Sequence, residues 1–124
     1  MSNNIDKLDI SILRYLNEHK EATTTDIAKY IIKTMKLKKT KDNLVKLDNK
    51  IRFRLKRFVD SHLILCTKTS PAYYSLNRSK VLFGEGTLTI KNTKGRQFSM
   101  DLGEFVVIIG LDGELIVKPL EDTN

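Results

Sequence analysis

Apolar residues recur at the spacing of a helix in two stretches near the start of the chain. Residues 6–16 carry one such stripe, formed by Leu8, Ile12, Leu13 and Leu16. Residues 23–26 then supply hydroxyl and carboxylate groups that cap a second helix, whose stripe is formed by Ile27, Ala28, Ile31 and Ile32. The spacing predicts amphipathic helices that end near residues 17–20 and 33–35 respectively.

A third and longer helix is predicted from about residue 40 to residue 61. Its apolar positions fall at steps of three and four and share one narrow face, formed by Leu44, Leu47, Ile51, Leu55 and Phe58. The opposite face carries Lys46, Asn49, Lys50, Phe53, Lys56 and Arg57. We therefore expect the apolar face to pack on the first two helices and the basic face to point outward.

The rest of the chain has strand-forming composition. Residues 63–68 and 72–76 flank a Thr-Ser-Pro turn, residues 87–91 and 96–100 flank a turn at 92–95, and residues 104–109 and 114–117 flank a turn at 110–113. The pattern predicts an α+β chain with a three-helix unit and a hairpin in residues 1–79, followed by a β-rich module of two hairpins in residues 80–124.

This β-rich module is too small to bury much apolar surface by itself. Residues 105–109 are apolar on both faces of the predicted strand, so both faces should be covered. We expect the sheet to pack on the helical unit, on its copy in a dimer, or on both.

Positive charge is concentrated in one part of the chain. The net charge is +7, but residues 1–80 hold 18 basic and 8 acidic side chains (+10), whereas residues 81–124 hold 4 and 7 (−3). Residues 33–57 alone contain 11 basic side chains and two acids, a local sum of +9. Such a concentrated charge attracts a polyanion, although a lysine-rich helix face that is merely solvated is the alternative.

Residues 51–64, Ile-Arg-Phe-Arg-Leu-Lys-Arg-Phe-Val-Asp-Ser-His-Leu-Ile, resemble the end of the recognition helix and the first wing strand of winged helix-turn-helix regulators. The MarR-like, ArsR-like and Lrp-like groups share this pattern, and the resemblance extends over about residues 6–77. Two features depart from it. His62 stands where these proteins usually have Gly, at a helix end that often needs a left-handed backbone, and residues 35–41 form a longer, basic link.

The resemblance implies that the third helix lies in the major groove of DNA. Asn49 can then bond an adenine edge in two places, and Lys50 and Arg52 can reach guanine or phosphate. Phe53 can pack on thymine methyl groups, but a protein or dimer contact, or an inward turn of the side chain, explains it equally well. Phosphate contacts are expected from Lys46, Lys56 and Arg57, and from Lys68 at the wing tip.

No catalytic, cofactor or metal site is indicated. His19 and His62 are far apart, and the single Cys66 is expected to be a buried structural thiol in a strand. Residues 84–86 (Gly-Glu-Gly) lack the ending of a phosphate loop. We expect no enzymatic activity, no cofactor and no small-molecule effector. With no apolar run long enough for a membrane span, we expect a cytoplasmic location.

The sequence thus predicts a double-stranded DNA-binding protein, a transcription regulator that acts as a homodimer on paired half-sites. The alternative is a winged-helix module that binds protein within a larger assembly, which the charge of residues 33–57 disfavours. RNA binding is disfavoured because no strand platform rich in aromatic residues is present.

Overall fold

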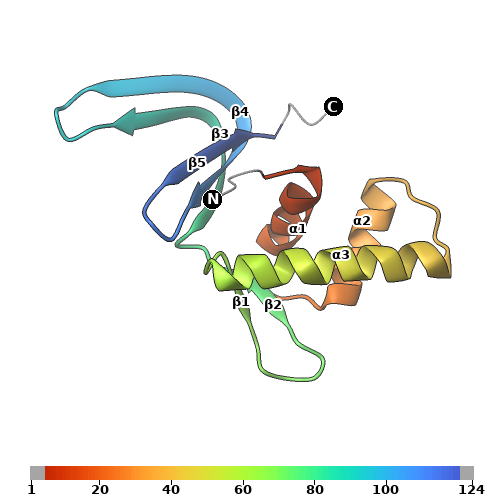
Figure 1. The fold of residues 1–124 in the computed structure, drawn as a ribbon. Helices are drawn as coiled ribbons and strands as arrows, with labels where there is room; N and C mark the ends of the chain where they lie inside the picture. Colours follow the sequence, from red (N-terminus) through yellow and green to blue (C-terminus); the bar gives the residue numbers. More distant parts are fainter. Residues whose placement is uncertain (1–4, 121–124) are drawn as a thin grey trace.

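The computed structural model describes residues 5–120, which form three helices followed by two antiparallel sheets (Figure 1). This is the expected α+β arrangement. The elements are α1 (Lys7–Glu18), α2 (Thr24–Thr34), α3 (Lys41–Asp60), β1 (Ile64–Cys66), β2 (Tyr74–Leu76), β3 (Val81–Lys91), β4 (Gln97–Ile109) and β5 (Leu115–Pro119). No helix within residues 5–120 has the length and apolar character to cross a membrane.

Each helix begins at a polar residue whose side chain accepts a hydrogen bond from the backbone three residues on. Asp6 caps α1 and Thr23 caps α2, and in both helices the carboxylate at the third position, Asp9 or Asp26, accepts a bond in return. Thr40 caps α3 by accepting from the Asn43 N–H. These bonds, reciprocal in α1 and α2 and one-way in α3, satisfy backbone groups that a helix start leaves unpaired, so the predicted helix starts are confirmed.

The end of α3 is fixed by a left-handed residue. His62 has a φ of 64°, as its position predicted. Its N–H donates to the Val59 carbonyl at 3.0 Å, and the Leu63 N–H donates to the Phe58 carbonyl at 2.9 Å. This pair of bonds is the Schellman arrangement, in which the side chains of Leu63 and Phe58 also meet in the core.

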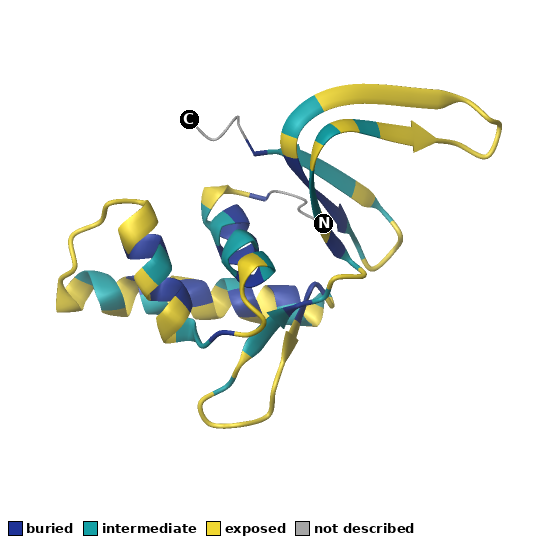
Figure 2. Ribbon diagram, turned by 180° about the vertical axis from the view of Figure 1, so that it is seen from behind, coloured by how far each residue is buried: buried dark blue, intermediate teal, exposed yellow. Residues whose placement is uncertain are grey.

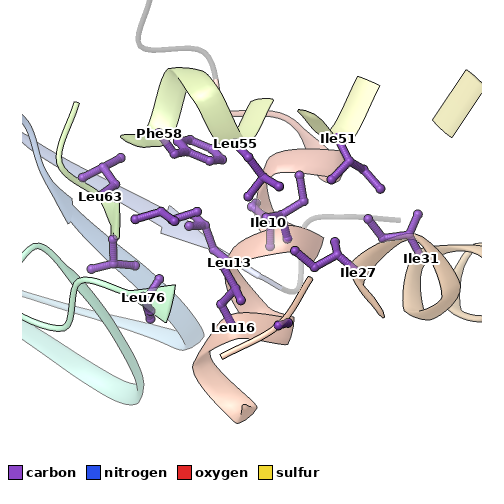
Figure 3. Packing of buried hydrophobic residues seen from close by; sticks show 14 of the residues in the cluster. Ile10, Leu13, Leu16, Ile27, Ile31, Ile51, Leu55, Phe58, Leu63 and Leu76 are labelled. Atoms are coloured by element: carbon purple, nitrogen blue, oxygen red, sulfur yellow. The ribbon is translucent and has the colours of Figure 1, made fainter. Parts of the chain in front are cut away.

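The three helical stripes converge on one hydrophobic core. Figure 3 shows side chains from all three helices and from the segment after α3 pointing toward one another. Most predicted stripe residues are buried, while Leu8 and Leu44 lie half-buried at its margin. Ile10, which the predicted stripe omits, is 4% exposed and belongs to the same core.

The hairpin after α3 is shorter than predicted but pairs as expected. Ile64 faces Leu76 and Cys66 faces Tyr74 in an antiparallel register. Ala22, between α1 and α2, exchanges two backbone hydrogen bonds with Tyr74, at 2.9 and 2.8 Å. The expectation of a buried Cys66 is wrong: its thiol is exposed, because this short strand is covered on one side only.

Both predicted hairpins of residues 80–124 are present, but the strands of the first are much longer. β3 pairs with β4 over their full lengths, with a bulge where Gly86 faces Gly103 and Thr87 faces Asp101. Gly86 and Gly103 both have positive φ, which lets the strand pair bend without ending. Val81, Val106 and Ile108 lie in the helical core, so the sheet packs on the helical unit.

A buried carboxylate ties α1 to α3. Asp9 is fully buried, and its two oxygens accept hydrogen bonds from Arg54 Nη1 and Arg57 Nη2, both at 2.9 Å. Arg54 Nη1 also lies 2.7 Å from both oxygens of Asp6. Burial acts to raise the pKa of the Asp6 carboxyl, but the hydrogen bonds from Arg54 and the Asp9 backbone outweigh it, and the pKa is lowered. The same hydrogen bonds to Asp6 and Asp9 raise the pKa of Arg54.

We predict that Asp9→Asn lowers the free energy of unfolding by about 3 kcal/mol, because it removes the buried charge that two arginines share. Asp26→Asn is the matched control. Asp26 holds the same capping position in α2 but is exposed and forms no ion pair within residues 5–120. It should cost about 0.5 kcal/mol. Urea unfolding followed by circular dichroism measures both, and equal losses would refute a special role for Asp9.

Candidate nucleic-acid interface

The outward side of α3 carries two parallel rows of exposed side chains. At about 100° per residue, positions separated by four, three and four residues stack along a helix. The hairpin-side row contains Val45, Asn49, Arg52 and Lys56, and the α1-side row contains Lys46, Lys50, Phe53 and Arg57. All eight residues are exposed, so the face predicted for DNA contact is open in this chain.

The hairpin-side row lies next to the β1–β2 hairpin. Burial raises the pKa of the Tyr74 hydroxyl in β2, the Cys66 thiol raises it further, and the positive charge of Arg52 acts in the opposite direction. Arg52 is thus close enough to β2 to influence it. Arg52 Nε also donates to Asp48 at 2.8 Å, which fixes the guanidinium along the helix. Lys56 forms no side-chain hydrogen bond or ion pair within the described part of the chain, and it is free to meet an anion.

The α1-side row is partly committed to contacts within the protein. Arg57 donates to the buried Asp9, although its side chain remains 46% exposed. Lys46 lies 3.5 Å from Asp42 one turn earlier. A cation already neutralised by a carboxylate gains less from a phosphate, so Lys46 and Arg57, like Arg52 with its bond to Asp48, are weaker phosphate ligands than their exposure suggests.

Phe53 borders an apolar groove rather than standing alone among lysines. The groove has a volume of about 700 Å³ and lies between the start of α1, the link after α2 and α3. Phe53 is 69% exposed, and the groove is also lined by Lys50 of the same row and by Asn49, which stands at the border between the two rows. The remaining apolar lining comes from Leu8, Met35, Leu37 and Leu47.

The groove and the β1–β2 hairpin lie on different sides of α3. In Figures 1 and 2 the link between α2 and α3 lies on one side of the long helix and the hairpin projects from the other. Lys68, in the exposed turn of the hairpin, is therefore on the side of Arg52 and away from Phe53. The eight predicted contact residues thus occupy two adjoining surfaces.

Two further elements border this region and were not assigned from the sequence. Thr24, the first residue of α2, lies close enough to Tyr74 in β2 to act on the pKa of its hydroxyl, in the lowering direction, which places that helix start beside the hairpin. Near the other end of α2, a hollow of about 550 Å³ is lined by Lys29, Lys33, Lys36 and Lys39 together with two apolar residues. The basic run in residues 33–39 was visible in the sequence, but its gathering with Lys29 around one hollow depends on the left-handed turn at Lys36, which has a φ of 55°.

Within residues 5–120, no group of three or more His, Cys, Asp or Glu residues is placed to hold a metal ion. No protein-family model, no curated protein and no solved structure matches this chain. The exposed rows of α3, their charge and the hairpin beside them are therefore the features of this chain that bear on its function.

Proposed function

We propose that this chain is a double-stranded DNA-binding protein, a transcription regulator that places α3 in the major groove. The observation that carries this proposal is the open face of α3, on which Lys50, Arg52 and Lys56 are exposed over about 1.7 turns. An α-helix fits the major groove, where base edges differ in their hydrogen-bonding groups, and basic side chains release counterions from the phosphates.

The order and pairing of the elements support a winged helix-turn-helix within residues 1–79. The chain runs from α1 through Ala22 to α2, then to α3 and the β1–β2 hairpin. Ala22 pairs with β2, which pairs with β1, so the hairpin is anchored to the helices on one edge. The β1–β2 hairpin then corresponds to the wing of the winged helix-turn-helix regulators that residues 51–64 resemble.

Roles within the interface follow from the two rows. Asn49 and Arg52 are the candidates for base contacts, since both are exposed at the centre of α3. Lys56 and Lys68 are the candidates for phosphate contacts on the hairpin side. The hollow lined by Lys29, Lys33, Lys36 and Lys39 supplies further positive charge beside the start of α3.

We predict that duplex binding weakens steeply with salt, with a slope of log K against log salt of roughly −4 to −5 for four to six neutralised phosphates per protomer. Lys56→Ala should weaken binding to every duplex and make the slope shallower by about 1. Lys91→Ala is the control, since it removes one exposed lysine from β3, far from α3. Fluorescence anisotropy at several salt concentrations measures both, and a flat salt response of the unaltered protein would refute the proposal.

Asn49→Ala should have a different effect from Lys56→Ala. We predict that it reduces the preference for the cognate duplex over a single-base variant by about 1–3 kcal/mol at one position, while binding to scrambled duplex stays the same. A selection from randomised duplexes identifies the cognate sequence, and competition binding then gives the preference. Equal losses on cognate and scrambled duplex would remove Asn49 from base recognition.

The apolar groove beside Phe53 favours a second function, the binding of a protein within a larger assembly. A side chain as large as Phe that is 69% exposed beside other apolar groups is typical of a protein contact. This function uses the side of α3 away from the hairpin, so it is compatible with DNA binding.

Phe53→Ala separates the two functions. We predict that it weakens duplex binding less than Lys56→Ala does, because Phe53 borders the groove on the side away from the hairpin. The free energy of unfolding should change by about 0.5 kcal/mol or less, since the ring is mostly exposed. A larger loss of DNA affinity, confined to sites containing thymine, would instead assign Phe53 to base contact.

A further inference from the structure

A dense group of lysines lies between the two acidic residues Asp26 and Asp42. Residues 27–41 contain six lysines and no acid, which gives +6 over most of α2 and the link to α3. Four of these six lysines surround the hollow of about 550 Å³ near the end of α2, and no acidic residue lines it. We call it the lysine hollow, and its lining residues are Lys29, Ile32, Lys33, Lys36, Leu37 and Lys39.

Two of the four lysines come from α2 and two from the link that follows it. Lys29 and Lys33 are four residues apart, so they lie on the same face of α2. The Leu37 N–H donates to the Ile32 carbonyl at 3.0 Å, and the residue between them with positive φ is Lys36. This is the bond of a Schellman turn, which folds the link back at the end of α2. The turn thus brings the lysines of the link to the hollow that the lysines of α2 border.

The other end of the link is tied to the start of α3. The Thr40 N–H donates to the Lys38 carbonyl at 2.9 Å, and Asn43 Nδ2 donates to the same carbonyl at 3.0 Å. The link lies at the end of the helical unit away from the sheet β3–β4–β5 (Figures 1 and 2). Local hydrogen bonds at both of its ends therefore set the place of the hollow.

The lysines of the hollow have no anionic partner in the described part of the chain. None of the four forms an ion pair within residues 5–120, whereas Lys46, Arg52 and Arg57 on α3 each bind a carboxylate. Like charges that surround one small volume repel one another, and an anion between them removes that repulsion. The lysine hollow is therefore the place in this chain where an added anion gains most.

The end of α2 explains only part of this lysine group. A helix C-terminus carries a partial charge of about −0.5 and attracts cations, which accounts for Lys33 and Lys36. Lys29 lies one turn earlier, and Lys39 lies beyond the Schellman turn, so the helix end accounts for neither. Since half a negative charge stands against four lysines, the hollow remains strongly positive.

We propose that the lysine hollow binds a compact oligophosphate, a free anion that carries two or more linked phosphate groups. A terminal phosphate group carries a charge of about −1.5 to −2 at pH 7, so two or three linked phosphates match four lysines. The ammonium group of lysine binds phosphate as a compact charge. The volume of the hollow is within the range of about 300–1,000 Å³ that small-molecule sites occupy.

The backbone of a DNA duplex matches this hollow less well. Each strand carries one negative charge per about 3.4 Å of helix axis, so a single phosphate that enters the hollow neutralises only part of its charge. Linked phosphates bring all their charges into one volume. Leu37 also lines the groove beside Phe53, so an anion in the hollow would tie one wall of that groove to α2.

This site goes beyond the proposed DNA binding and does not depend on it. Inorganic tripolyphosphate is titrated into the DNA-free full chain by isothermal titration calorimetry, in a phosphate-free buffer at about 0.15 M salt, which screens distant charges. The unaltered protein should bind one tripolyphosphate at least about tenfold more tightly than orthophosphate, since one phosphate group supplies less charge. A dissociation constant above about 1 mM, or equal affinity for the two anions, would overturn the proposal.

Lys33→Gln should raise the dissociation constant for tripolyphosphate by at least about fivefold, because it removes one of the four charges. Lys38→Gln is the matched control. Lys38 belongs to the same basic run and its loss changes the net charge equally, but it does not line the hollow, so the constant should change by less than about twofold. Circular dichroism should show that both variants stay folded, since both residues are exposed. Equal effects of the two variants would mean that net charge alone explains binding, and would refute the site.

Duplex binding distinguishes a free oligophosphate from the DNA backbone as the occupant. Lys33→Gln should weaken duplex binding less than Lys56→Ala does in the same anisotropy assay. A protein that binds no tripolyphosphate, and whose duplex binding Lys33→Gln weakens as much as Lys56→Ala does, would overturn the proposal and assign the hollow to the backbone. Because the calorimetry uses no DNA, its outcome is separate from the success or failure of the DNA-binding proposal.

Discussion

The arrangement of the helices depends on the buried carboxylate of Asp9. A carboxylate removed from water is costly unless strong hydrogen bonds replace its hydration, and here two guanidinium groups of α3 supply them. Because Arg54 and Arg57 lie one turn apart, the bonds fix both the distance of α1 from α3 and the rotation of α3 about its axis. The rotation decides which side chains of α3 face solvent, so this ion cluster determines where the two exposed rows point.

The helices and their inward faces could be predicted from the sequence because periodicity and capping residues are local signals. The stripe Leu47, Ile51, Leu55 and Phe58 is buried as its spacing indicates, and His62 takes the left-handed conformation expected of it. The role of Asp9 could not be predicted. Capping of α1 is enough to explain an acid at this position. The two arginines that bind Asp9 lie 45 and 48 residues away in the chain, where no local pattern points to them.

The candidate site was predicted as one face, whereas α3 presents two rows with different neighbours. A helical projection separates inward from outward residues, but it cannot show what stands on either flank of the helix. The neighbours of Phe53 come from the start of α1 and the link after α2, and those of Arg52 come from the β1–β2 hairpin. In the β-rich part, the turns were found from Asn-Thr-Lys-Gly and Gly-Leu-Asp-Gly, but the bulge at Gly86 and Gly103 was not, so one long strand was interpreted as two shorter pieces.

The bonds that end α3 also have a mechanical consequence. Leu63 is buried directly after His62, and β1 begins at the next residue, Ile64. No flexible linker therefore separates α3 from the hairpin that follows it. The two elements must therefore tilt together, and the span from the middle of α3 to the hairpin turn is constant whatever surface they meet. The six exposed residues between α2 and α3, residues 35–40, have no such restraint from the core. Any movement that adapts α3 to a bound surface would then occur in residues 35–40, before the helix begins, while the C-terminal end of α3 stays rigidly joined to the hairpin.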